Sequence, residues 1–134
     1  MTIMTEDGNK IVGVGSSMIL HSLYSTSKIR VKMSSLRVGV ALGFLKTGEC
    51  KKNKVEKAVE QLKLIKAELL EHEPTEAVYD YRDLTVEVPW KNNINKDVYS
   101  CVELYTTDNG SILIDELIEL LEYACENQLS VVLP

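Results

Sequence analysis

The sequence predicts a single α/β domain of the α+β kind over residues 1–134, with a small mixed sheet of four to five strands and three to four helices packed against it. Three observations support this prediction. The length suits one domain with its own core. The composition, 45% hydrophobic and 26% charged, is that of an ordinary globular protein. Segments with a helical period are also interspersed with short apolar runs typical of strands.

The N-terminal region begins with polar residues. We expect residues 1–9 to be flexible and to end in a turn at Asp7-Gly8-Asn9. Lys10–Gly15 then predicts a short strand with apolar residues in its centre. Ser16-Ser17 is a good cap for a helix over residues 18–24.

The next two segments differ in their periodicity. Lys28–Met33 alternates charged and apolar residues, which favours a half-buried strand, although the frayed end of the preceding helix would give the same pattern. Leu36–Lys46 predicts a buried helix that ends at Thr47-Gly48. Gly39 and Gly43 weaken this helix, because each costs about 1 kcal/mol relative to alanine.

The clearest helix lies near the middle of the chain. Apolar residues recur at helical spacing over Val55–Leu69, and charged residues fill the opposite face. Asn53 stands before this run as a cap, and Glu56 lies three residues on, as in a capping box. His72 and Pro74 mark the end of the helix.

The C-terminal half supplies the remaining strands and a last helix. Residues 112–126 place their apolar side chains on one side of a helix, so Asp108-Asn109-Gly110 is interpreted as a strand-to-helix turn. Short apolar runs predict strands at Ala77–Tyr81, Thr85–Val88, Val98–Thr106 and Leu129–Leu133.

The charge is divided unevenly along the chain. Residues 1–54 carry nine Lys and Arg against three Asp and Glu, a net charge of +6, and residues 55–134 carry six against seventeen, a net charge of −11, which together give −5. A long acidic surface attracts basic partners and repels nucleic acid. We therefore expect a protein partner and no nucleic acid.

The last predicted helix carries a stripe of four carboxylates at spacings of 4, 3 and 4. Like charges at that spacing destabilise a helix by a few tenths of a kcal/mol per pair, and no lysine or arginine follows Lys96. A cationic partner covering the stripe would explain it; a plain solvated face is the alternative. These residues are Asp115, Glu119, Glu122 and Glu126.

A second candidate contact surface lies in residues 79–97. Trp90, the only tryptophan, follows Pro89 among aromatic and acidic residues, a mixture common at protein interfaces. Alternatively, Trp90 fills the edge of the core and organises the loop. The carboxylates that we expect to contact a partner here are Asp80, Asp83 and Glu87. Asp80 and Asp83 would also suit acid–base chemistry.

The sequence carries no catalytic motif. Gly13–Ser17 resembles a phosphate-binding turn, but Met18 stands where a dinucleotide fingerprint needs its third glycine, and the Lys-Ser/Thr ending of a P-loop is missing. His21 has no acid or nucleophile placed beside it by the sequence. We expect no enzymatic activity and no cofactor.

Cysteine and hydropathy patterns limit the compartment. The three cysteines form no C-x-x-C pair and no zinc pattern, so reduced thiols and no metal are expected. The longest apolar stretch, Leu36–Leu45, is about half the length that a membrane span needs. Glu6 and Asp7 stand where a signal peptide needs positive charge. A cytoplasmic protein without membrane contact is expected, and no homo-oligomer is indicated.

A set of short motifs resembles one immunity family of bacterial polymorphic-toxin and contact-dependent growth inhibition systems, and the likeness spans roughly residues 11–128. Their order along the chain carries the resemblance. The motifs are Gly15-Ser16-Ser17, Leu20-His21-Ser22, Ser25-Thr26, the helix Val59–Leu69, Val78-Tyr79-Asp80, Asp83-Leu84, Pro89–Ile94 and Tyr105–Gly110.

The resemblance implies a non-enzymatic antidote. Such a protein binds the C-terminal toxin domain of its cognate effector in the cytoplasm and blocks the active site or substrate groove. An acidic surface fits that role if the toxin is a nuclease, because nuclease clefts are basic. Two other interpretations stay open: an acidic adaptor or regulatory subunit with another basic partner, and a small hydrolase.

Overall fold

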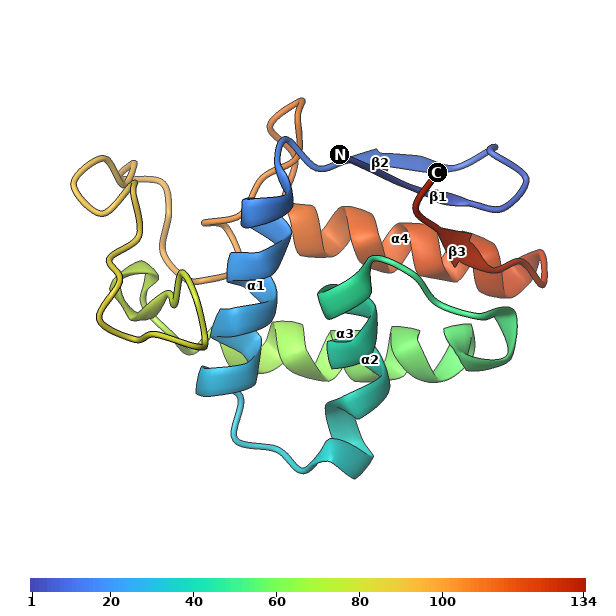
Figure 1. Cartoon of the computed structure of the whole chain (residues 1–134), viewed down its shortest axis with the longest axis horizontal. Helices are drawn as coiled ribbons and strands as arrows, with labels where there is room; N and C mark the ends of the chain where they lie inside the picture. The colour runs from blue at the N-terminus through green and yellow to red at the C-terminus, as the bar shows by residue number, and fades with distance from the viewer.

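The computed structural model describes residues 1–134 as four α-helices and a three-stranded antiparallel sheet with strand order β2-β1-β3. This confirms the α+β class, but the sheet is antiparallel and has fewer strands than predicted. In Figure 1, α3 and α4 run side by side and α1 and α2 cross them. The elements are β1 (Thr2–Thr5), β2 (Ile11–Gly13), α1 (Ser17–Arg30), α2 (Ser35–Thr47), α3 (Val55–Leu69), α4 (Leu113–Glu126) and β3 (Val131–Val132), with 3-10 turns at Lys52–Lys54 and Pro74–Glu76.

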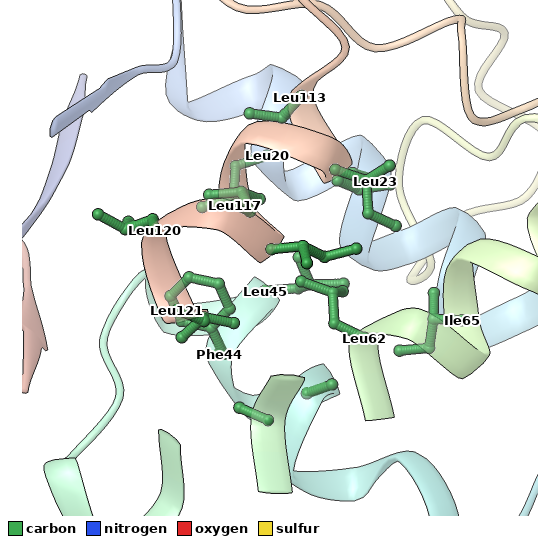
Figure 2. Packing of buried hydrophobic residues seen from close by; sticks show 14 of the residues in the cluster. Leu20, Leu23, Phe44, Leu45, Leu62, Ile65, Leu113, Leu117, Leu120 and Leu121 are labelled. Carbon is green, nitrogen blue, oxygen red and sulfur yellow. The ribbon is translucent and has the colours of Figure 1, made fainter. Parts of the chain in front are cut away.

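All four helices contribute to one hydrophobic core. The cluster contains 28 buried residues. Burying a leucine or isoleucine side chain contributes about 1.5–3 kcal/mol, so the helical layer supplies most of the folding energy. Figure 2 shows the central side chains: Leu20 and Leu23 of α1, Phe44 and Leu45 of α2, Leu62 and Ile65 of α3, and Leu113, Leu117, Leu120 and Leu121 of α4.

The first residues form the central strand of the sheet. Residues 1–9 were expected to be flexible, but they include β1, which pairs with β2 and β3 and buries Ile3 completely. Thr5 is also fully buried, and its hydroxyl donates to the Asp7 carboxylate at 2.7 Å. Two buried positions in four residues are too few to show a period in the sequence. The predicted turn is present, with Gly8 at φ 74°.

The Lys28–Met33 segment is not a strand. Helix α1 continues to Arg30, and the Val31 N–H still donates to the Ser27 carbonyl at 3.0 Å. The alternating residues are the last helical turn and the start of a linker, which is close to the alternative interpretation of the pattern. Their alternation therefore does not reflect a pleated backbone.

The other three helices match the sequence closely. Helix α2 ends at Gly48, whose φ of 75° is the left-handed C-cap conformation that favours glycine. Helix α3 begins at Val55 after a 3-10 turn, so Lys54 takes the cap position that was predicted for Asn53. Helix α4 buries the predicted apolar side. None of the helices is both long and apolar enough to cross a bilayer.

The strands predicted in residues 77–106 are absent. Apart from a bridge between Thr106 and Ile112, this segment is irregular. Its backbone is held by α1, because Thr26 accepts a hydrogen bond from the Val78 N–H at 2.8 Å and Ser25 accepts one from the Tyr81 N–H at 3.0 Å. Side chains of α1 thus form the hydrogen bonds that a neighbouring strand would form in a sheet.

Candidate protein-binding surface

The α4 carboxylates are partly compensated by the neighbouring helix. Lys66 of α3 lies 2.6 Å from Asp115, and Lys63 lies 3.3 Å from Glu122. The four side chains are between 34% and 56% exposed, so each pair contributes at most about 1 kcal/mol. The sequence pattern missed these lysines because they belong to another helix. The sequence of α4 alone predicted a stripe without neighbouring cations, and the structure shows that α3 supplies two.

A shallow acidic groove runs between the start of α3 and the end of α4. It encloses about 290 Å³ and is called the acidic groove below. Val59 and Cys125 line it together with four carboxylates, and Lys63 is the one lysine paired to any of them. The carboxylates are Glu56, Glu60, Glu122 and Glu126.

This groove brings together one predicted pair of residues and one unpredicted pair. Glu122 and Glu126 were predicted contacts, whereas Glu56 and Glu60 were not. The antiparallel packing of α3 on α4 creates the set, and the charges on the outer face of α3 were the only signal in the sequence. Glu119, the remaining stripe residue, is exposed and forms no ion pair, but it does not line the groove.

The chemistry of the acidic groove suits a lysine or arginine side chain. The aliphatic stem of such a side chain packs on an apolar surface while its charged head stays near water and carboxylates. Val59 provides the apolar surface, and Glu56, Glu60 and Glu126 carry no intramolecular ion pair. Three of the four carboxylates in the groove thus have no cation within the chain.

The predicted carboxylates of the loop are held within the chain. Asp80 accepts two hydrogen bonds from the Arg82 guanidinium, at 3.0 and 3.1 Å, and lies 3.3 Å from the His21 ring. Hydrogen bonds from Arg82, then from His21, hold the pKa of Asp80 well below its usual range. Its charge is therefore largely satisfied before any partner arrives.

Asp83 and Glu87 are also engaged locally. Thr85 donates to Asp83 through its hydroxyl at 2.6 Å, and this bond lowers the pKa of Asp83. Lys91 donates to Glu87 at 2.8 Å and lowers the pKa of that carboxyl. Both bonds are exposed, so they shape the loop more than they stabilise the fold.

Trp90 packs inward. Its ring lies edge-on to Tyr79 at 6.0 Å and to Tyr105 at 6.1 Å, and its Nε1 atom is buried without a hydrogen-bond partner. Tyr105 in turn is buried, with its hydroxyl 2.8 Å from those of Ser22 and Thr26. This geometry agrees with the interpretation that Trp90 fills the edge of the core.

Other side chains of the same loop face solvent. Leu84, Val86 and Tyr99 are 63%, 43% and 75% exposed. Exposed apolar side chains on a polar loop could contact a partner, whereas Trp90 packs against the chain itself. We call Leu84, Val86 and Tyr99 the loop anchors.

The two predicted contact surfaces lie towards opposite ends of the molecule. In Figure 1 the loop projects on the left, where α3 ends and α4 begins. The start of α3 and the end of α4, whose residues line the acidic groove, lie towards the right. Helix α4 has 14 residues and so spans about 20 Å. No hydrogen bond or ion pair connects the two surfaces, which therefore form separate patches.

The features expected of an enzyme are weak in this structure. No group of three or more His, Cys, Asp or Glu side chains is arranged to hold a metal ion. Cys50 and Cys101 are buried, and burial raises the pKa of the two thiols to about 11 and about 12, so neither is activated as a nucleophile. His21 contacts Asp80, but Asp80 is bound more closely by Arg82.

Comparison with known proteins supplies the family. No curated protein and no solved structure matches the chain. A family model described as Immunity protein 70 matches residues 5–133, which includes the acidic groove and the loop. This confirms the resemblance to an immunity family of toxin systems. The chain belongs to the Immunity protein 70 family and is thus an immunity protein directed against a toxin.

Proposed function

We propose that this chain neutralises the C-terminal toxin domain of a cognate contact-dependent inhibition or polymorphic-toxin effector. It acts in the cytoplasm, by binding rather than by catalysis, and blocks the active site or substrate groove of the toxin. Family membership supports the toxin as partner. The observation that carries the mode of binding is the acidic groove, where four carboxylates meet around one paired lysine.

The charge of the groove favours a nuclease as the toxin. A nuclease cleft binds phosphates and so carries lysine and arginine. Glu56, Glu60 and Glu126 have no cation of their own in this structure and gain one in such a complex. Electrostatic attraction also raises the association rate by orders of magnitude, which an antidote needs because it competes with the toxin's substrate.

The loop gives the second part of the interface. Asp80, Asp83, Glu87 and Trp90 set its conformation through contacts inside the chain. The loop anchors, Leu84, Val86 and Tyr99, then supply apolar area at the other end of α4. The charge at one end raises the rate of association, and the apolar area at the other end lengthens the lifetime of the complex.

Charge reversal in the groove tests this proposal. The full chain and the toxin domain encoded by the neighbouring effector gene are purified, and their affinity is measured by calorimetry. We expect Glu56→Lys with Glu126→Lys to weaken binding at least about tenfold. The control is Glu71→Lys with Glu116→Lys, which changes the net charge equally at positions outside the groove. Equal affinities of the two double variants would remove the groove from the interface.

A further inference from the structure

A second cavity, larger than the acidic groove, adjoins it at the start of α3. It encloses about 890 Å³, against 290 Å³ for the acidic groove, and is open to solvent. Helix α2 forms one wall, residues 49–54 form another, and β3 closes it. We call it the α2/β3 groove. Its volume falls within the range of sites that bind ligands or peptide segments.

Two glycines of α2 line this groove, and the packing of the chain does not require glycine at either position. A Cβ atom at Gly43 would meet nothing within 4 Å, and one at Gly39 would meet only the Ser35 Cβ, at 3.6 Å. Neither has a positive φ, unlike Gly48. Glycine weakens a helix interior, so the packing of this chain does not explain either residue. A backbone that approaches α2 closely in a complex does explain them.

The segment that forms two walls of the groove is basic, although the lining itself holds two lysines and two glutamates. Residues 35–57 carry six Lys and Arg against two Glu, a net charge of +4, and none of the six cations forms an ion pair. Lys51 and Lys54 line the groove itself. The two acids that line it, Glu6 and Glu49, accept hydrogen bonds from the backbone N–H groups of Ser130 and Leu133.

We propose that the α2/β3 groove binds a carboxylate-bearing segment of the toxin, with its backbone against Gly39 and Gly43 and its acids on Lys51 and Lys54. This rests on the proposed function, because the partner is the same toxin. Val40 and Val132, which are half-buried, also line the groove and suit an apolar face of that segment.

The two grooves adjoin at the start of α3. Lys54 lines the α2/β3 groove and Glu56, two residues on, lines the acidic groove. A partner that fills both must present an acidic segment beside a basic patch. Because the charge changes from positive to negative between Lys54 and Glu56, a toxin can bind in only one orientation. A toxin without a matching arrangement of charges would bind more weakly.

A groove-filling variant tests the occupancy of the α2/β3 groove. Affinity for the same toxin domain is measured for Gly43→Trp and for its control Gly43→Ala. The alanine methyl group enters space that is open in the free chain, so we expect a raised Tm. In the complex this methyl group would meet the bound backbone, so we expect a loss of affinity that is much smaller than that of the tryptophan variant. The indole fills the groove, and we expect a loss of at least about thirtyfold, the effect of removing a central contact. Melting curves confirm that both variants are folded.

A charge variant tests the chemistry of the occupant. We expect Lys51→Glu with Lys54→Glu to weaken binding at least about tenfold. The control, Lys28→Glu with Lys32→Glu, makes the same charge change at exposed positions around the end of α1 and should bind as the wild type does.

The outcomes separate the proposals. Equal binding of Gly43→Trp and Gly43→Ala overturns the α2/β3 groove as a contact and leaves the antidote function standing. If Gly43→Trp weakens binding of the toxin domain but Lys51→Glu with Lys54→Glu does not, a segment occupies the groove without contacting these lysines through carboxylates. That result overturns the proposal that the segment is acidic. Failure of the wild-type chain to bind the toxin overturns the proposed function and this inference together.

Discussion

Replacing Tyr105 by phenylalanine should destabilise the protein by about 1–3 kcal/mol. The hydroxyl of Tyr105 is buried and lies 2.8 Å from the hydroxyls of Ser22 and Thr26. Both α1 hydroxyls also donate to the Val78 carbonyl, at 2.8 and 3.2 Å. With both of those protons on Val78, the Tyr105 hydroxyl donates its own proton to one of the two oxygens. The variant therefore loses one buried hydrogen bond but keeps the aromatic ring, so neither a large cavity nor a lost Trp90 contact complicates the result.

The assay is urea unfolding followed by circular dichroism and by tryptophan fluorescence. Trp90 is the only tryptophan, so its emission reports on the loop alone. Ser22→Ala and the double variant Ser22→Ala/Tyr105→Phe complete a cycle. Because the two residues share one bond, the double variant should cost less than the sum of the single changes. A cost below about 0.5 kcal/mol for Tyr105→Phe, or strict additivity, would refute this account of how α1 holds the loop.

Three further results are expected. Gly13→Ala should destabilise the fold by about 1–3 kcal/mol, since its Cβ would meet the Asp108 carboxylate; if the clash is the cause, most of this loss vanishes in an Asp108→Ala background. Among the three thiols, Cys125 alone should react rapidly with a thiol reagent in the native protein, because the other two are buried; rapid labelling of all three would contradict the core. The hydrogen bond with His72 lowers the pKa of Glu76 from its ordinary 4.5, so this carboxylate stabilises the fold above pH 4.5 and the contribution disappears as the pH falls below it; Glu76→Gln should flatten that part of an acid-stability curve, and an unchanged curve would exclude the pair.

The long helices were predictable because their own side chains carry the signal. The apolar periods of α3 and α4 and the Gly48 stop are local features, and the structure reproduces them. The predicted strands in residues 77–106 failed because hydroxyl groups of α1, such as that of Thr26, bind the backbone there. No periodicity within a segment reveals a partner that lies some 50 residues away in the chain.

The composition of the acidic groove was predictable only in part, for the same reason. Glu122 and Glu126 were found from the spacing along one helix, whereas Glu56 and Glu60 join them through the packing of α3 on α4. The partial burial of Trp90 likewise depends on residues remote in sequence, Tyr79 and Tyr105. The basic partner indicated by the charge pattern stays a prediction, and the tertiary contacts decide which carboxylates lack an ion pair within the chain.

The association rate of the chain with its toxin domain, measured by stopped flow at low and high salt, tests the central claim most directly. Screening shortens the reach of exposed charges to roughly 8 Å at 0.15 M salt. We expect the wild-type rate to fall as salt is added, and the Glu56→Lys/Glu126→Lys variant to be at least about tenfold slower at low salt with a weaker salt dependence. A wild-type rate that is independent of salt and equal to that of the variant would contradict binding through the acidic groove.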